Sequence, residues 1–156
     1  MAIVGVLMTM SIVAFHKIGS GTALRSSTMM FKSGVSLARQ TAITKRSPTT
    51  LIYGNLGNPP RAFYMITNEL EGIVGYTNWL SDGIVFYEDT EQVMVYGDPH
   101  AAYLEPLYFE VDGSMDNGAI NRYIGLRENK LSGDTNVLNS VMCLEPLTGR
   151  ISEYVR

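Results

Sequence analysis

The first 46 residues contain no acidic side chain, and this asymmetry constrains the fold more than any other feature of the chain. Residues 1–15 form an uncharged, mostly apolar run, and residues 16–46 then carry six basic side chains. Residues 47–156 carry six basic and fifteen acidic side chains, a local net charge of −9. This division predicts one long helix over residues 1–46, followed by an acidic globular domain over residues 47–156.

The basic part of the predicted helix contains an apolar stripe with helical spacing. It consists of Leu24, Phe31, Val35, Ala38 and Ala42. These positions fall on one face of a 3.6-residue helix, so residues 22–46 are predicted to form an amphipathic helix that packs on the globular domain. Met30 and Leu37 are predicted to widen the stripe. Ser47-Pro48 is predicted to end the helix, because the residue before proline disfavours the α conformation.

The apolar run at residues 1–15 has three interpretations: a signal peptide, a transmembrane helix or a buried helix end. No basic residue precedes it and no small-residue cleavage site follows it, which argues against a signal peptide. Fifteen helical residues span about 22 Å, less than the hydrocarbon core of about 30 Å. We therefore expect the true beginning of this helix to be missing. Gly19-Ser20-Gly21 is predicted to be its weakest point, since each glycine costs up to about 1 kcal/mol.

Short β-rich segments alternate with turn signatures after residue 48. The predicted strands are residues 49–53, 62–67, 84–87, 92–96, 107–111, 120–127, 137–144 and 151–155. Residues 68–78 are ambiguous. This spacing predicts an antiparallel β domain, and with the helix an α+β fold.

Neither a catalytic nor a cofactor-binding pattern is evident in the sequence. Cys143 is the single cysteine, so no internal disulfide can form, and its apolar neighbours predict a buried thiol in a strand. His16 and His100 have no second metal ligand near them in sequence, and nucleophile-elbow and phosphate-loop motifs are absent. We therefore predict a non-enzymatic chain with no cofactor.

Two weak ligand patterns are present near the C-terminal end. Asp112, Ser114 and Asp116 alternate as in a calcium loop, but the closing glutamate is missing and Asp-Gly is a common turn former. Arg150 and Arg156 could contact DNA. Glu153 lies between them, and so acidic a domain is a poor match for a phosphate backbone, so nucleic acid is not the expected partner.

Five stretches, taken in order, resemble the GspH/FimT family, the H-type minor pseudopilins of type II secretion and related minor type IV pilins. They are residues 1–7 (MAIVGVL), 37–46 (LARQTAITKR), 79–86 (WLSDGIVF), 108–114 (YFEVDGS) and 141–151 (VMCLEPLTGRI). The first is similar to the later part of the class III prepilin signature. Ser81 stands where the family usually has proline, which puts that one turn in doubt.

The resemblance implies a pilin-like fold, with a long, partly transmembrane N-terminal helix packed on an antiparallel β-sheet domain. It implies that the leader peptide and the first residues of the mature protein are absent from this sequence. The subunit would be anchored by a single pass in the bacterial inner membrane, with the globular domain outside the cytoplasm. Its expected partners are other pilins or pseudopilins in a filament, inner-membrane lipid, and the secretion or pilus assembly platform.

The helix residues expected to contact membrane or filament are Ile3, Val6, Leu7, Met10 and Val13. The basic face of the helix has three possible roles: it could meet anionic lipid headgroups, an acidic face of a neighbouring subunit, or only solvent. The alternative function within the family is a minor type IV pilin that binds DNA during uptake.

Overall fold

The computed structural model describes residues 2–54, 60–67, 73–87, 106–115, 122–129, 139–148 and 150–155, with the backbone alone for residues 2–20, 154 and 155. One helix and eight strands lie in these ranges. They are α1 (Ala2–Lys45), β1 (Thr49–Tyr53), β2 (Ala62–Thr67), β3 (Ile73–Trp79), β4 (Ile84–Tyr87), β5 (Leu107–Phe109), β6 (Arg122–Glu128), β7 (Asn139–Leu144) and β8 (Ile151–Val155). The predicted α+β class is confirmed.

Helix α1 is continuous through Gly19-Ser20-Gly21 and ends at Lys45. Arg46 adopts a left-handed conformation with φ of 49°, and the Ser47 amide donates to the Ala42 carbonyl at 3.2 Å. This six-to-one hydrogen bond over a left-handed residue is a Schellman motif. The helix therefore ends one residue before the predicted end at residue 46, because its last carbonyls are already capped at Arg46.

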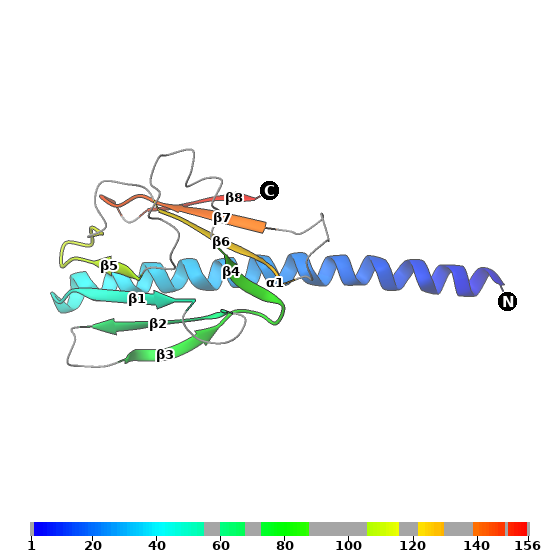
Figure 1. Cartoon of the computed structure of the whole chain (residues 1–156), viewed down its shortest axis with the longest axis horizontal. Helices are drawn as coiled ribbons and strands as arrows, with labels where there is room; N and C mark the ends of the chain where they lie inside the picture. The colour runs from blue at the N-terminus through cyan, green and yellow to red at the C-terminus, as the bar shows by residue number, and fades with distance from the viewer. Residues whose placement is uncertain are drawn as a thin grey trace.

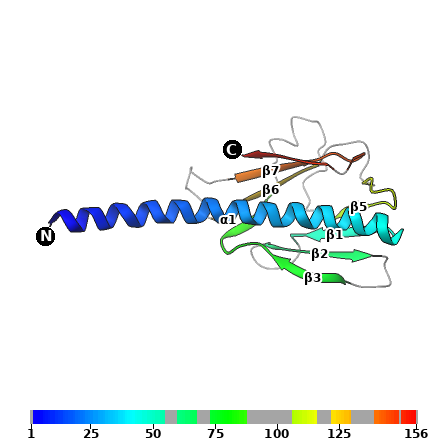
Figure 2. The same ribbon diagram turned by 180° about the vertical axis from the view of Figure 1, so that it is seen from behind.

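The strands form two antiparallel sheets of four strands each, on either side of α1 (Figure 1). We name them sheet A, with strand order β3-β2-β1-β5, and sheet B, with strand order β4-β6-β7-β8. Figure 2, from behind, shows the same layering, with the C-terminal half of α1 between the sheets and its N-terminal half extending beyond both. The two sheets were not separated by the sequence analysis, because the pairing of β1 with β5 joins segments far apart in the chain.

The predicted strands at residues 49–53, 62–67, 84–87 and 151–155 coincide with β1, β2, β4 and β8. The strand predicted at residues 107–111 is shorter as β5. The described parts of the strands predicted at 120–127 and 137–144 belong to β6, which continues to Glu128, and to β7. Residues 120, 121, 137 and 138 lie outside the described residues. The segment at residues 92–96 lies outside the described residues.

Strand β3 falls in the segment that the sequence left ambiguous. The β2–β3 register shifts between Phe63 and Met65, and Gly75 within β3 has a φ of 82°. This bulge interrupts the two-residue alternation from which a strand is recognised in sequence.

The core is centred on Phe31, whose side chain is fully buried between the two sheets. Its ring meets those of Tyr53 on β1, Phe63 on β2 and Phe86 on β4 at centroid distances of 5.6, 5.3 and 5.2 Å, all edge-to-face. Two of these rings belong to sheet A and one to sheet B. A single helix side chain therefore ties α1 to both sheets.

Candidate assembly surfaces along helix α1

The five stripe residues of α1 lie against the sheets. Leu24 is 6% exposed, and the other four are fully buried in one apolar core with β1, β2, β4, β5, β6 and β7. Met30 and Leu37, predicted to widen the stripe, are instead 37% and 53% exposed. At about 100° per residue they lie roughly 120–140° around the helix from Leu24, too far to reach the same core.

Polar contacts add to this packing on both sides of the helix. The Ser27 hydroxyl on α1 accepts a hydrogen bond from the Ser81 amide at 3.0 Å. The Arg39 Nε donates to the Gly113 carbonyl at 3.2 Å. These contacts fix the helix at the turn before β4 and at the turn after β5.

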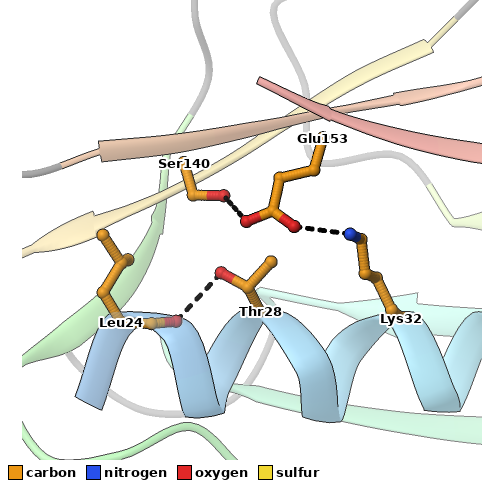
Figure 3. Close-up of polar contacts among 5 residues, drawn as sticks. All are labelled: Leu24, Thr28, Lys32, Ser140 and Glu153. Carbon is orange, nitrogen blue, oxygen red and sulfur yellow. Dashed lines mark hydrogen bonds and ion pairs between the residues drawn. The ribbon is translucent and has the colours of Figure 1, made fainter. Parts of the chain in front are cut away.

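The third polar contact joins α1 to the C-terminal strand β8 (Figure 3). The Lys32 ammonium lies 2.5 Å from one Glu153 carboxylate oxygen, and the Ser140 hydroxyl on β7 donates to the other at 3.1 Å. The Lys32 and Glu153 side chains are 31% and 27% exposed. The sequence analysis missed this contact, because a lysine and a glutamate 121 positions apart carry no local signal.

Two of the six basic side chains of residues 16–46, those of Lys32 and Arg39, thus make contacts within the subunit. Arg25, Lys45 and Arg46 are exposed. The basic side chains of α1 therefore serve two roles, and the part available to a lipid or a partner is smaller than the sequence suggested.

A solvent-open groove of about 510 Å³ lies between α1 and the inner side of β7 and β8. Its walls include Leu24, Arg25 and Met29 from the helix, and Ser140 and Glu153 from sheet B. The groove marks the place where sheet B separates from the helix. Gly21 at its edge directly follows residues 2–20 of α1.

Apolar side chains also remain on the solvent side of α1. Met29, Met30, Leu37 and Ile43 are each between 37% and 53% exposed. Together with the extended N-terminal half of the helix, these side chains form a surface along α1 that neither sheet covers. The residues expected to contact membrane or filament (Ile3, Val6, Leu7, Met10 and Val13) belong to that half, in which the structure describes the backbone alone. Within the described part of the chain, no helix combines the length and hydropathy needed to cross a bilayer.

Two of the three predicted calcium ligands, Asp112 and Ser114, lie in the turn after β5. The Asp112 carboxylate accepts hydrogen bonds from the Ser114 amide at 2.8 Å and from the Ser114 hydroxyl at 2.6 Å. These bonds lower the pKa of Asp112 and stabilise the turn, in which Gly113 has a φ of 82°. Asp116 lies outside the described residues. Among the described residues, no three His, Cys, Asp or Glu side chains converge as a metal site.

Of the predicted DNA contacts, Arg150 is exposed, and Arg156 lies outside the described residues. Glu153, which lies between them in sequence, turns toward α1. Cys143 is buried on β7, as its sequence neighbours predicted, and burial raises the pKa of its thiol. The structure describes no side chain for His16 and lacks a described position for His100.

No protein-family model and no curated protein matches the sequence. Two crystal structures of the type IV minor pilin FimU from Pseudomonas aeruginosa do share its fold. The form in space group P21 aligns with a TM-score of 0.56 at 15% identity, covering 84% of this chain and 87% of FimU. The form in space group P65 gives 0.54 at 16% identity, covering 84% and 92%. The predicted pilin-like fold is therefore confirmed.

Proposed function

We propose that this chain is a non-enzymatic structural subunit, a minor pilin or pseudopilin, of a type IV pilus-like or type II secretion filament. The observation that carries the proposal is the division of α1. One face of its C-terminal half is buried against both sheets, whereas its N-terminal half extends beyond them and begins with an uncharged, mostly apolar sequence. A helix of this form is suited to insert among neighbouring helices or into lipid, where apolar burial supplies the driving force.

The fold shared with a minor type IV pilin and the ordered family motifs support the same function. In this proposal, residues 1–15 anchor the subunit in the inner membrane before assembly, with the β domain outside the cytoplasm. The same residues, including Ile3, Val6 and Leu7, then contact other subunits in the filament. The assembly platform would act on the subunit while its helix is in the membrane.

Deletion of residues 1–20 tests the proposal, because it removes the extended half of α1 and keeps every described core residue. The experiment compares the full chain with the deletion in cells that make the filament. We expect the truncated protein to keep a cooperative thermal transition, to leave the membrane fraction and to be absent from filaments sheared off the cells.

A milder variant, Leu7→Lys, places a charge in the apolar run at a cost of about 2.5–3.5 kcal/mol if that position lies in a bilayer. Thr44→Lys, near the other end of α1, is the matched control. Filaments that still incorporate the deletion variant would contradict the proposal.

A further inference from the structure

The outer face of sheet A, the face turned away from α1, is continuous and apolar. The β1–β2 register pairs Thr50 with Ile66 and Ile52 with Tyr64. Since successive strand residues alternate between faces, and Leu51, Tyr53, Phe63 and Met65 lie in the core, these four residues point outward. The neighbouring strands extend the face: Tyr108 on β5 pairs with Thr50, Ile73 on β3 pairs with Ile66, and Trp79 pairs with Ala62.

None of the four strands of sheet A contains a charged residue. A sheet with one face in water normally alternates apolar inward residues with polar outward ones. Here the outward positions are mostly isoleucine, tyrosine and tryptophan. Ile73, Tyr108 and Trp79 are 54%, 46% and 49% exposed, and Thr50, Ile52, Tyr64 and Ile66 between them are half-buried, whereas Ala62, the partner of Trp79, is buried. A continuous exposed apolar face is typical of an interaction site.

The charge of the domain indicates which partner this face fits. Residues 47–156 carry fifteen acidic and six basic side chains, so two such domains repel one another over most of their surfaces. The outer face of sheet A is where two copies can meet without placing like charges opposite each other. At its rim, Arg61 is paired with Asp82 and lies over the Trp79 ring, so these two charges are already balanced.

The dimensions of the face predict a weak association. Four strands about 4.8 Å apart and up to about 20 Å long give roughly 400 Å² per copy. A standard stable interface buries about 800 Å² per partner.

We propose that the outer face of sheet A is a self-association surface that pairs with the same face of a second copy of this chain. The pairing has two-fold symmetry: both copies use the same patch, and each contact between two residues occurs twice. The inference is independent of the filament function proposed above. Self-association can fail while filament incorporation persists, and the reverse also holds.

The test measures self-association of the full chain in mild detergent by sedimentation equilibrium. We expect wild type to associate with a Kd between about 1 μM and 1 mM. The double variant Ile73→Lys/Tyr108→Lys should weaken the association at least about tenfold, because it places like charges across the interface. Both side chains are about half exposed, so the substitutions leave the core intact, which a thermal transition checks.

Two control variants separate this face from other routes of association. Leu147→Lys changes a side chain that is 82% exposed in the turn between β7 and β8. Leu37→Lys changes the exposed apolar side of α1. Both should leave the Kd unchanged. In addition, Thr50→Cys, in the middle of the face, should form an intermolecular disulfide on oxidation, whereas Leu147→Cys should not.

Three outcomes would overturn the proposal. Wild type that stays monomeric to about 1 mM would do so. The proposal would also be overturned if Leu37→Lys abolished the association and the double variant left it intact. The association would then be assigned to the helix. Loss of binding to phosphatidylglycerol vesicles in the double variant, with a monomeric wild type, would assign the face to a membrane.

Discussion

The outer faces of the two sheets differ in both burial and charge. On sheet B, Val85, Val141 and Cys143 point away from α1 by register and are at most 6% exposed. On sheet A, Ile73 and Tyr108, on the two edge strands, are about half exposed, and the outward residues Thr50, Ile52, Tyr64 and Ile66 on the central strands are partly exposed. Sheet B also carries charged residues in its strands, whereas sheet A has none. Sheet A, whose strands contain no charged residue, is thus the sheet whose outer face is more exposed.

The inner faces of the two sheets, by contrast, serve the same purpose. Both supply apolar side chains to the core around Phe31, and both contact α1. The difference therefore lies outside the requirements of folding. It agrees with the proposal that the outer face of sheet A is a self-association surface.

The largest predicted effect comes from placing the same charge on each outer face. Val141→Lys should lower the free energy of unfolding by about 3–5 kcal/mol, because the ammonium would be buried without a partner. Ile73→Lys should change it by less than about 0.5 kcal/mol, since its side chain already reaches solvent. Urea unfolding followed by circular dichroism measures both. Equal losses in the two variants would contradict the difference in burial.

Thiol chemistry provides a second comparison of the two faces. Cys143 should react with iodoacetamide at least about a hundredfold more slowly than an engineered Tyr108→Cys thiol. Burial raises the pKa of Cys143, so less reactive thiolate is present at a given pH, and its rate should keep rising at pH values where the engineered thiol has levelled off. Mass spectrometry at several pH values separates the two sites. Equally rapid labelling of Cys143 in the folded protein would show that sheet B's outer face is open.

The packing face of helix α1 could be predicted from the sequence. Leu24, Phe31 and Val35 repeat with a helical period, and the structure buries all three. The prediction that Leu37 widens the stripe was wrong, because Leu37 lies roughly 140° around the helix from Leu24 and is exposed. The helix end was predicted to within one residue, and the left-handed cap at Arg46 was not, because a left-handed arginine has no sequence signature as clear as glycine.

The sheets were less accessible, because pairing between distant strands carries no local signal. Residues 49–53 and 62–67 alternate well and were located as strands, whereas the bulged β3 was not. The charge-free composition of sheet A is present in the sequence. It becomes visible only when β1, β2, β3 and β5 are known to be neighbours. The Lys32–Glu153 contact depends on the same tertiary information.

A third prediction enlarges one side chain on each outer face. A Cβ at Gly125 on β6 would lie 2.4 Å from the Tyr87 ring, and that ring also lies under the Arg127 guanidinium at 5.4 Å. The ring is held from two sides, so Gly125→Ala should cost about 1–3 kcal/mol through overpacking. Thr50→Ile, on the open face of sheet A, should change stability by less than about 0.5 kcal/mol. Thermal unfolding measures both, and a neutral Gly125→Ala would mean that Tyr87 can move aside.

The smallest predicted effect concerns how each sheet is joined to α1. A double-mutant cycle of Lys32→Met and Glu153→Gln should give a coupling of about 0.2–1 kcal/mol, because both side chains are partly exposed and water screens the pair. The coupling should fall in 1 M salt, where the Debye length is only about 3 Å. The control is the Phe31–Phe63 ring pair between α1 and sheet A, measured with leucine substitutions. Its coupling should be about 0.5–1.5 kcal/mol and insensitive to salt. A Lys32–Glu153 coupling that is independent of salt and larger than that of the rings would contradict this prediction. The polar contact to β8 would then stabilise the packing of the helix more than the ring contact to sheet A does.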